Sequence, residues 1–159
     1  MRVFCTFVIV LGLAAGPVSA QSSDQQVSDT TDTELTRSVI QAKKKMIIAA
    51  NVDLTEAESQ GFWPIYNDYQ NGIRKNNDRI LALIEDFAAN YEVMTDAKAK
   101  SLLEEAIAIE TDELAWKNSY LPKFGKVLPA KKLVQYYQVE NKLKAIIDYD
   151  LAGAIPLVK

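Results

Sequence analysis

The chain has 159 residues, with 18 Lys and Arg against 21 Asp and Glu, no histidine and a hydrophobic fraction of 48%. This composition is that of an ordinary globular domain and excludes collagen-like and disordered chains. The formal net charge of −3 argues against bulk nucleic-acid binding, which needs an excess of basic residues. The single cysteine, Cys5, leaves no disulfide and no set of thiolate or imidazole metal ligands.

Residues 1–20 have the pattern of a cleaved secretory signal peptide. Arg2 supplies a positive start, an apolar run follows to Ala15, and Val18-Ser19-Ala20 offers small residues for cleavage. The apolar run is shorter than the roughly 20 residues that span a bilayer, so we expect no stable membrane insertion. The mature protein is therefore predicted to begin at Gln21 and to reside in a bacterial periplasm.

Three further regions are predicted after the signal peptide. Residues 21–32 are rich in Ser, Gln, Asp and Thr and read as a flexible leader, because they bury too little apolar area to offset ordering. Residues 33–150 read as one helical domain. Residues 151–159 contain Gly153 and Pro156 and read as an apolar, non-helical tail.

The helical domain is predicted to be all-α, because apolar residues recur every three or four positions among strong helix formers. Four long helices are expected, over roughly 34–50, 55–90, from 95 onward, and 129–150. Kinks are expected at Pro64 and Pro122, which lie inside helical patterns. The expected architecture is a hairpin-built cradle or an elongated bundle.

The spacing of the apolar residues predicts which face of each helix is buried. The first helix is expected to bury a stripe of small and aliphatic residues: Leu35, Val39, Ala42, Met46 and Ala49. The third is expected to bury Leu102, Ala106, Ile109, Trp116, Tyr120 and Phe124. Phe62, Tyr66, Phe87 and Tyr137 are also expected in the core, while some of Trp63, Tyr69, Tyr120 and Tyr136 face a groove.

Catalytic patterns are absent from the sequence, so no enzyme activity and no cofactor are predicted. There is no glycine-rich phosphate loop, no Ser-x-x-Lys pair after the signal, and no histidine for a di-metal bundle. The carboxylates around Glu104-Glu105 and Glu110 read as a solvated helix face. Loose coordination of Ca²⁺ or Mg²⁺ by these carboxylates stays an alternative, because hard cations prefer oxygen ligands.

A partner-binding surface is the most specific functional prediction. The basic run 43–45 and Arg37 form a local cationic cluster on an acidic protein. Cations steer an acidic or unfolded chain at long range, and aromatic rings then supply apolar contact area. The residues predicted to contact a polypeptide partner are Arg37, Lys43 and Lys44, with some of Trp63, Tyr69 and Tyr136. An ordinary solvated surface is the alternative interpretation of the basic run.

Two short segments resemble each other at a constant offset of 74 residues. They are Leu54-Thr55-x-x-Glu58 followed by Phe62-Trp63, and Leu128-Pro129-x-x-Lys132 followed by Tyr136-Tyr137. Each places a leucine and a helix-starting residue ahead of an aromatic pair. Chance similarity between two amphipathic helices is the alternative explanation.

With the preceding secretion signal, these segments resemble the periplasmic Spy/CpxP-like family and its Leu-Thr-x-x-Gln motifs, over about residues 35–150. Glu58 stands where the family has glutamine, and the second copy has Pro129 and Lys132 in place of threonine and glutamine. The resemblance implies an often dimeric four-helix cradle that serves as an ATP-independent chaperone, a metal-stress protein or an envelope-stress modulator.

The predicted function is therefore that of a non-enzymatic periplasmic protein that holds polypeptides without a cofactor, and the resemblance implies that it can form a homodimer. The alternative is a regulatory accessory that docks on one specific envelope-stress or metal-stress sensor. Promiscuous holding predicts an effect on several unrelated unfolded proteins, whereas specific docking predicts one partner.

Overall fold

The structure is a computed structural model that describes the backbone of residues 22–158 and the side chains of residues 35–158. Its elements are α1 (Ser22–Asn51), α2 (Glu56–Asn90), the 3₁₀ turn η1 (Tyr91–Val93), α3 (Asp96–Gly125) and α4 (Ala130–Ala154). Because residues 22–158 contain four helices and no strand, the all-α prediction is confirmed. The predicted signal peptide and Gln21 lie outside the described residues.

The chain divides into two compact units, residues 1–43 and 44–159. The described part of the first unit is helical from Ser22, so α1 covers the segment 22–32 that was predicted to be a flexible leader. That segment contains no glycine or proline to interrupt the helix, although all its residues except Val27 are polar. None of the helices within residues 22–158 is both long and apolar enough to cross a membrane.

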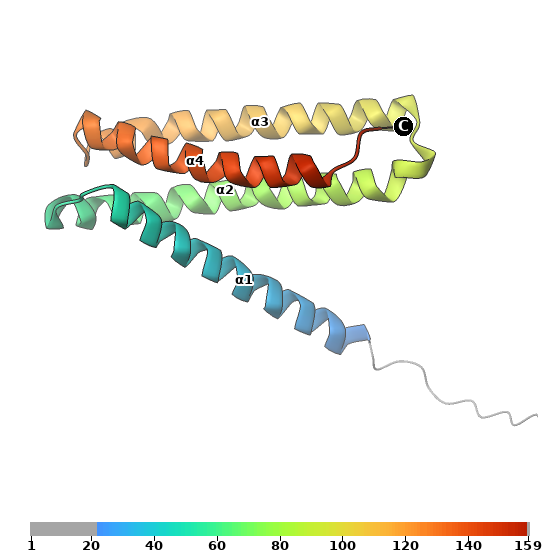
Figure 1. The fold of residues 1–159 in the computed structure, drawn as a ribbon, viewed down its shortest axis with the longest axis horizontal. Coiled ribbons are helices and arrows are strands. Elements are labelled where there is room, and N and C mark those ends of the chain that lie inside the picture. The colour runs from blue at the N-terminus through green and yellow to red at the C-terminus, as the bar shows by residue number, and fades with distance from the viewer. Residues whose placement is uncertain (1–21, 159) are drawn as a thin grey trace, which may run out of the picture. The chain divides into compact units, whose positions relative to one another are not determined.

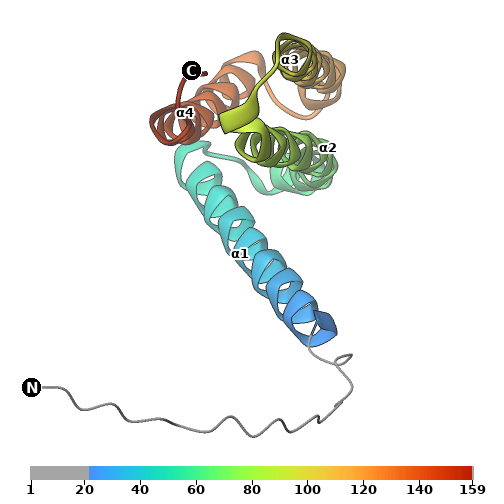
Figure 2. The same cartoon turned by 90° about the vertical axis from the view of Figure 1, so that its right-hand side faces the viewer.

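In the second unit, α2 and α3 lie side by side and run in opposite directions (Figure 1). α4 runs parallel to α2, because Glu58 pairs with Lys132 near the start of both helices and Gln70 pairs with Glu140 further along. Seen along their axes, these three helices occupy the corners of a triangle (Figure 2). The last turns of α1, from Lys44, belong to the same unit.

Local capping explains where α2 and α3 begin. Thr55 and Glu58 form the predicted capping box: the Thr55 N–H donates to Glu58 Oε2 (2.7 Å) and the Glu58 N–H donates to Thr55 Oγ1 (3.3 Å). Thr95 caps α3 by accepting the Lys98 N–H at 3.2 Å. Both helices continue through their internal prolines, Pro64 and Pro122, and the kinks expected there stay predictions.

Aromatic rings from three helices form the core of the second unit. Phe62 lies at its centre, with its ring centroid 5.5 Å from that of Phe124 and 5.1 Å from that of Tyr136. The other buried members are Ile48, Val52, Tyr66, Tyr69, Tyr120 and Leu128. Phe62, Tyr66 and Phe124 were predicted here and are buried, and the predicted core stripe of α3 is confirmed at its three buried positions, Ile109, Tyr120 and Phe124.

One predicted buried face and one predicted helix end are wrong. The predicted core stripe of α1 is exposed, with Leu35 and Met46 exposing 63% and 70% of their surface, and Ile48 and Val52 are buried instead. The end of α1 contacts the aromatic core through Ile48. Val52, four residues later in the following loop, is buried in the same core. At the other end, α4 continues to Ala154, so residues 151–154 are helical rather than part of a tail.

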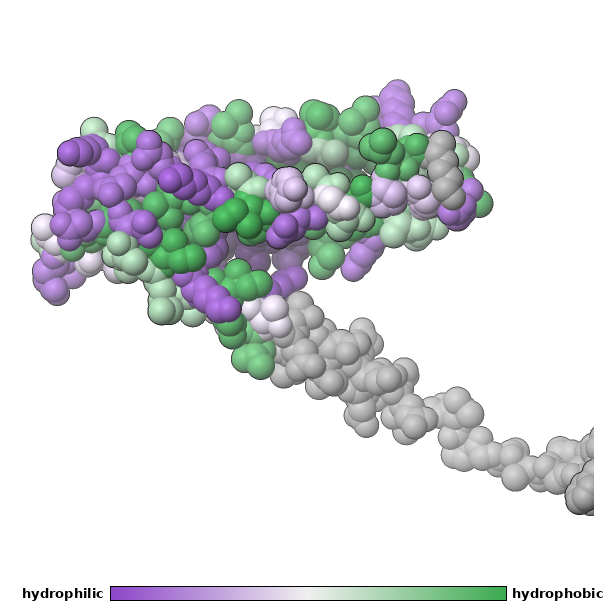
Figure 3. Space-filling view, viewed as in Figure 1, coloured by the Kyte–Doolittle hydropathy of each residue, from purple (hydrophilic) through white to green (hydrophobic). Residues whose placement is uncertain are grey.

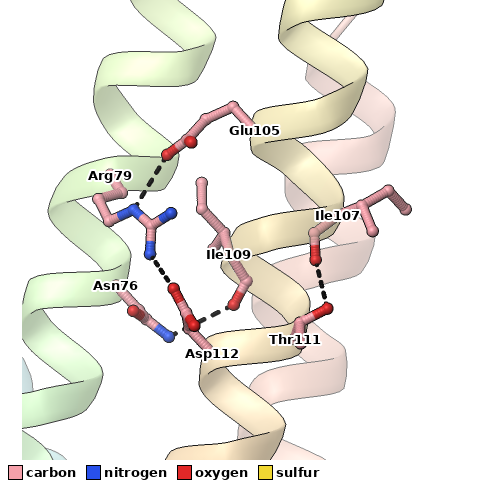
Figure 4. A network of polar contacts seen from close by, with 7 residues as sticks. All are labelled: Asn76, Arg79, Glu105, Ile107, Ile109, Thr111 and Asp112. Carbon is pink, nitrogen blue, oxygen red and sulfur yellow. Dashed lines mark hydrogen bonds and ion pairs between the residues drawn. The ribbon is translucent and has the colours of Figure 1, made fainter.

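An ionic clamp joins the middle of α2 to α3 (Figure 4). The Arg79 guanidinium lies between two carboxylates of α3, 3.0 Å from Glu105 Oε1 and 2.6 Å from Asp112 Oδ2. One turn earlier, Asn76 Nδ2 donates to the Ile109 carbonyl at 3.5 Å. These contacts fix the antiparallel register, because a shift of one turn would separate the guanidinium from its partners.

Gly72 of α2 leaves the space in which Trp116 of α3 packs. A Cβ at this position would overlap the Trp116 indole, which lies against the α2 backbone and donates its Nε1–H to the Tyr69 carbonyl at 3.0 Å. We expect Gly72→Ala to lower the free energy of unfolding by about 1–3 kcal/mol through overpacking, despite the better helix propensity of alanine. Urea unfolding followed by far-UV circular dichroism measures this change.

Gly153→Ala is the matched control, because a Cβ at Gly153 in α4 meets nothing within 4 Å. This variant should leave stability unchanged or raise it by up to about 1 kcal/mol. Equal stability of the two variants would show that Trp116 does not require the glycine.

Candidate partner-binding surface

The residues predicted to form a partner-binding surface separate into two groups. Tyr69 and Tyr136 are buried, so their predicted place on a groove is wrong, and they belong to the core. Trp63 is half-buried and packs edge-on against Phe62 and Tyr66. Sequence periodicity could not separate these rings, because every tyrosine of α2 and α4 lies on or beside an apolar stripe.

The basic residues of α1 also differ from one another. Lys43 is exposed and Arg37 is partly exposed, and both belong to the first unit. Lys44 instead belongs to the second unit, where its side chain exposes 18% of its surface and pairs with Glu140. Lys44 therefore acts in the interior rather than as a steering charge.

Lys44, Gln70 and Glu140 form a closed polar triangle inside the helices. Lys44 Nζ donates to Gln70 Oε1 and to Glu140 Oε2, each at 3.1 Å, and Gln70 Nε2 donates to Glu140 Oε1 at 3.1 Å. Gln70 and Glu140 are both only 8% exposed. Each side chain comes from a different helix, so the triangle ties α1, α2 and α4 together at one level.

Tyrosine rings surround this triangle. Burial raises the pKa of Tyr66, Tyr69 and Tyr136 well above the usual value, and the charge of Glu140 acts in the same direction. Burial also raises the pKa of Tyr137 to about 12. Among the described side chains, the buried hydroxyls of Tyr136 and Tyr137 have no hydrogen-bond partner. These phenols are therefore strongly desolvated.

The motif residues have structural roles at the common start of α2 and α4. Leu128 is buried, and Leu54 packs against the same core. Pro129 precedes the first residue of α4. Lys132 Nζ lies 2.6 Å from Glu58 Oε2, and this hydrogen bond, with the one from the Thr55 N–H, lowers the pKa of Glu58. The motif residues thus cap α2 and pair the start of α2 with that of α4.

The two similar segments pack against each other at equivalent positions. Glu58 and Lys132, which form the ion pair, are 74 residues apart. Phe62 and Tyr136 have the same offset, and their rings meet edge to face with centroids 5.1 Å apart. Equivalent positions of the two copies therefore lie at the same level of the parallel helices α2 and α4.

A row of large apolar side chains on α3 faces solvent. Leu103, Ile107, Leu114 and Leu121 expose 62%, 54%, 59% and 39% of their surface. Their spacing of four, seven and seven residues places them on one helix face, along about 27 Å at 1.5 Å per residue. In Figure 3, apolar groups recur along the upper edge of the molecule, where Figure 1 places α3. We call these four residues the α3 row.

The sequence contains a signal for the α3 row, namely apolar residues of α3 that its predicted core face does not include. The predicted core face of α3 already accounts for six apolar or aromatic residues, and the four residues of the row remain beside it. A helix that packs on one side needs only one such stripe, so a second one indicates a further contact surface.

Residues 35–158 contain no group of three or more carboxylate, cysteine or histidine side chains close enough together to hold a metal ion. The carboxylates of Glu105 and Asp112 instead pair with Arg79.

Comparison with known proteins gives no relative for this chain. No family model matches it, and neither a curated protein nor a solved structure does. The Spy/CpxP-like resemblance therefore rests on the two short motifs described above.

A mutant cycle tests the polar triangle. Glu140→Leu should lower the free energy of unfolding by about 3 kcal/mol, because it leaves the buried Lys44 ammonium and Gln70 amide without their shared partner. In the double variant Lys44→Met/Glu140→Leu, at least half of this loss should be recovered. Additive effects, within about 0.5 kcal/mol in chemical denaturation, would contradict direct pairing of the two charges.

A pair of identical chemical changes tests the tyrosine cluster. Tyr136→Phe removes a buried hydroxyl without a described partner, so stability should stay the same or rise by up to about 1 kcal/mol. Tyr120→Phe removes a hydroxyl that donates to the Asp68 carboxylate, and stability should fall by about 1 kcal/mol. Thermal unfolding of both variants gives the comparison, and a large loss for Tyr136→Phe would show that its hydroxyl is satisfied.

Proposed function

We propose that this protein is a non-enzymatic periplasmic binding protein that holds polypeptides without ATP. The observation that carries the proposal is the α3 row, which presents large aliphatic side chains to solvent beside a core that is already closed. Exposed apolar patches of this kind mark contact surfaces, because leaving them in water costs about 25 cal/mol per Å² of apolar area. The resemblance to the Spy/CpxP-like family points to the same function.

The chemistry of the row fits a non-native chain. Aliphatic side chains bind other apolar groups without directional requirements, so one row can accept many sequences. The neighbouring surface of α3 carries charged residues such as Glu104 and Glu110, which are exposed and keep the row in solution. Weak contacts repeated along the row would hold a client and still release it.

In the first unit, cations on α1 are proposed to attract a client independently of the α3 row. Lys43 is exposed and Arg37 partly exposed, and positive charge attracts an acidic segment at a distance. Lys44 is not part of the proposed surface, because its ammonium pairs with Glu140. Trp63 is half-buried, which fits its predicted role as an aromatic contact for a polypeptide partner.

A regulatory accessory that docks on one sensor is the second candidate. The seven-residue spacing of Ile107, Leu114 and Leu121 favours it, because a row that repeats every two turns runs straight along α3 and can follow one partner helix, as one half of a coiled-coil seam does. A second copy of the chain that used the same seam would form the homodimer that the family resemblance implies.

The proposal predicts that the parent protein suppresses light scattering by several unrelated denatured proteins in the absence of nucleotide. Ile107→Glu and Leu114→Glu together should reduce this suppression at least twofold, because two charges interrupt the row. Their folding stability should change by less than about 0.5 kcal/mol each, since both positions are exposed.

Leu81→Glu is the matched control, since Leu81 is 47% exposed on α2 and lies outside the row. It should suppress aggregation as the parent does. Suppression that is unaffected by the row variants would overturn the assignment of the surface. Binding of one envelope protein with no effect on denatured clients would establish the accessory role instead.

A further inference from the structure

The far end of the α2 and α3 pair contains an apolar cavity of about 290 Å³. Its walls are Leu83, Ile84 and Phe87 of α2, Met94 after η1, and Ala99, Leu102 and Leu103 of α3. Ile155 and Val158, which follow α4, complete the lining. All of these side chains are apolar, so the cavity suits a neutral, apolar ligand group.

One wall of the cavity is an extended piece of this same chain. α4 ends at Ala154, and Ile155 adopts an extended conformation with φ −91° and ψ 118°. Pro156 then prevents a return to helix, because it lacks an N–H and restricts the residue before it. Residues 155–158 therefore cross from α4 to the α2 and α3 pair as an extended strap (Figure 1).

The strap is held by few contacts. Tyr91 donates its hydroxyl proton to the Leu157 carbonyl at 3.1 Å, at an exposed position. Val158 still exposes 54% of its surface and Leu157 exposes 90%. The cavity volume remains with Ile155 and Val158 in its wall, so the strap covers the site without filling it.

We propose that this cavity binds an extended apolar segment of another polypeptide, and that residues 155–158 occupy it in cis as a competing strap. The strap itself shows the chemistry that the site accepts: aliphatic side chains against the cavity and a backbone carbonyl beside the Tyr91 hydroxyl. An incoming segment with side chains that reach deeper gains contacts that Val158 does not make. This inference rests on the proposed function, because the occupant is a stretch of a held polypeptide.

The strap sets the apparent affinity of the site. An incoming segment binds only when the strap is displaced, so its apparent dissociation constant equals the intrinsic one divided by the fraction of time for which the strap is open. Weakening the strap should therefore tighten peptide binding, and filling the cavity should abolish it. The two effects have opposite signs, which separates them from a general loss of folding.

The experiment measures fluorescence anisotropy of a labelled peptide, Ala-Ile-Pro-Leu-Val, with the full-length protein and its variants. Ala99→Phe fills the cavity and should weaken binding at least tenfold. Ala97→Phe adds the same ring at an exposed position of α3 that does not line the cavity, and should bind as the parent does. Equal binding by the two variants would overturn the site.

The strap is tested in the same assay. Val158→Ser removes a lining side chain and should tighten peptide binding, by up to about tenfold if the strap covers the site nine-tenths of the time. Leu157→Ser alters the neighbouring exposed side chain and should change nothing. Unchanged affinity in Val158→Ser would overturn competition by the strap.

Other occupants give different results. Saturable binding of dodecanoate without peptide binding would replace the proposed ligand with an acyl chain. A dimer in analytical ultracentrifugation that Val158→Ser dissociates would assign the cavity to the strap of a second copy.

Failure of this inference is distinct from failure of the proposed function. Suppression of aggregation that is equal in the parent and in Ala99→Phe, with no peptide bound, would leave holding intact and remove the cavity from it. Peptide binding with the predicted variant pattern, but no suppression by the parent, would keep the cavity and exclude holding.

Discussion

Glu140 places a carboxylate among buried tyrosine rings, and that charge must be paired before the helices around it can close. Lys44 supplies the opposite charge, and Gln70 bridges the two. Moving any one helix by a turn would leave an ammonium or a carboxylate buried without a partner. The triangle therefore fixes the register of α1, α2 and α4 more strictly than the aromatic contacts, which tolerate small shifts.

A second constraint acts at the start of the bundle, where the two similar segments meet. The ion pair between Glu58 and Lys132 and the contact between Phe62 and Tyr136 join equivalent positions of α2 and α4. Like residues at these positions would place two glutamates or two lysines together, so the differences between the copies are complementary. The opposite charges of Glu58 and Lys132 therefore stabilise the start of the parallel pair α2 and α4.

The sequence predicted most of what is decided locally. The starts of α2 and α3 follow from Thr55 and Thr95, because a cap depends on residues within one turn. The burial of Tyr69 and Tyr136 and the inward position of Lys44 could not be predicted in this way. The partner of Lys44 lies 96 residues away, and only packing brings the two together. The face of α1 was misassigned for the same reason, since its apolar residues are found on more than one side.

The α3 row shows a second thing that helical periodicity cannot predict. A stripe at helical spacing indicates that residues share a face, but not whether the fold covers that face. On α3 both outcomes occur: the face with Ile109, Tyr120 and Phe124 is buried, and the α3 row remains exposed. The strap at residues 155–158 covers apolar surface at one end of the same helix pair through few contacts. The proposed holding function requires such a weak cover, because a cover that bound tightly would exclude every client.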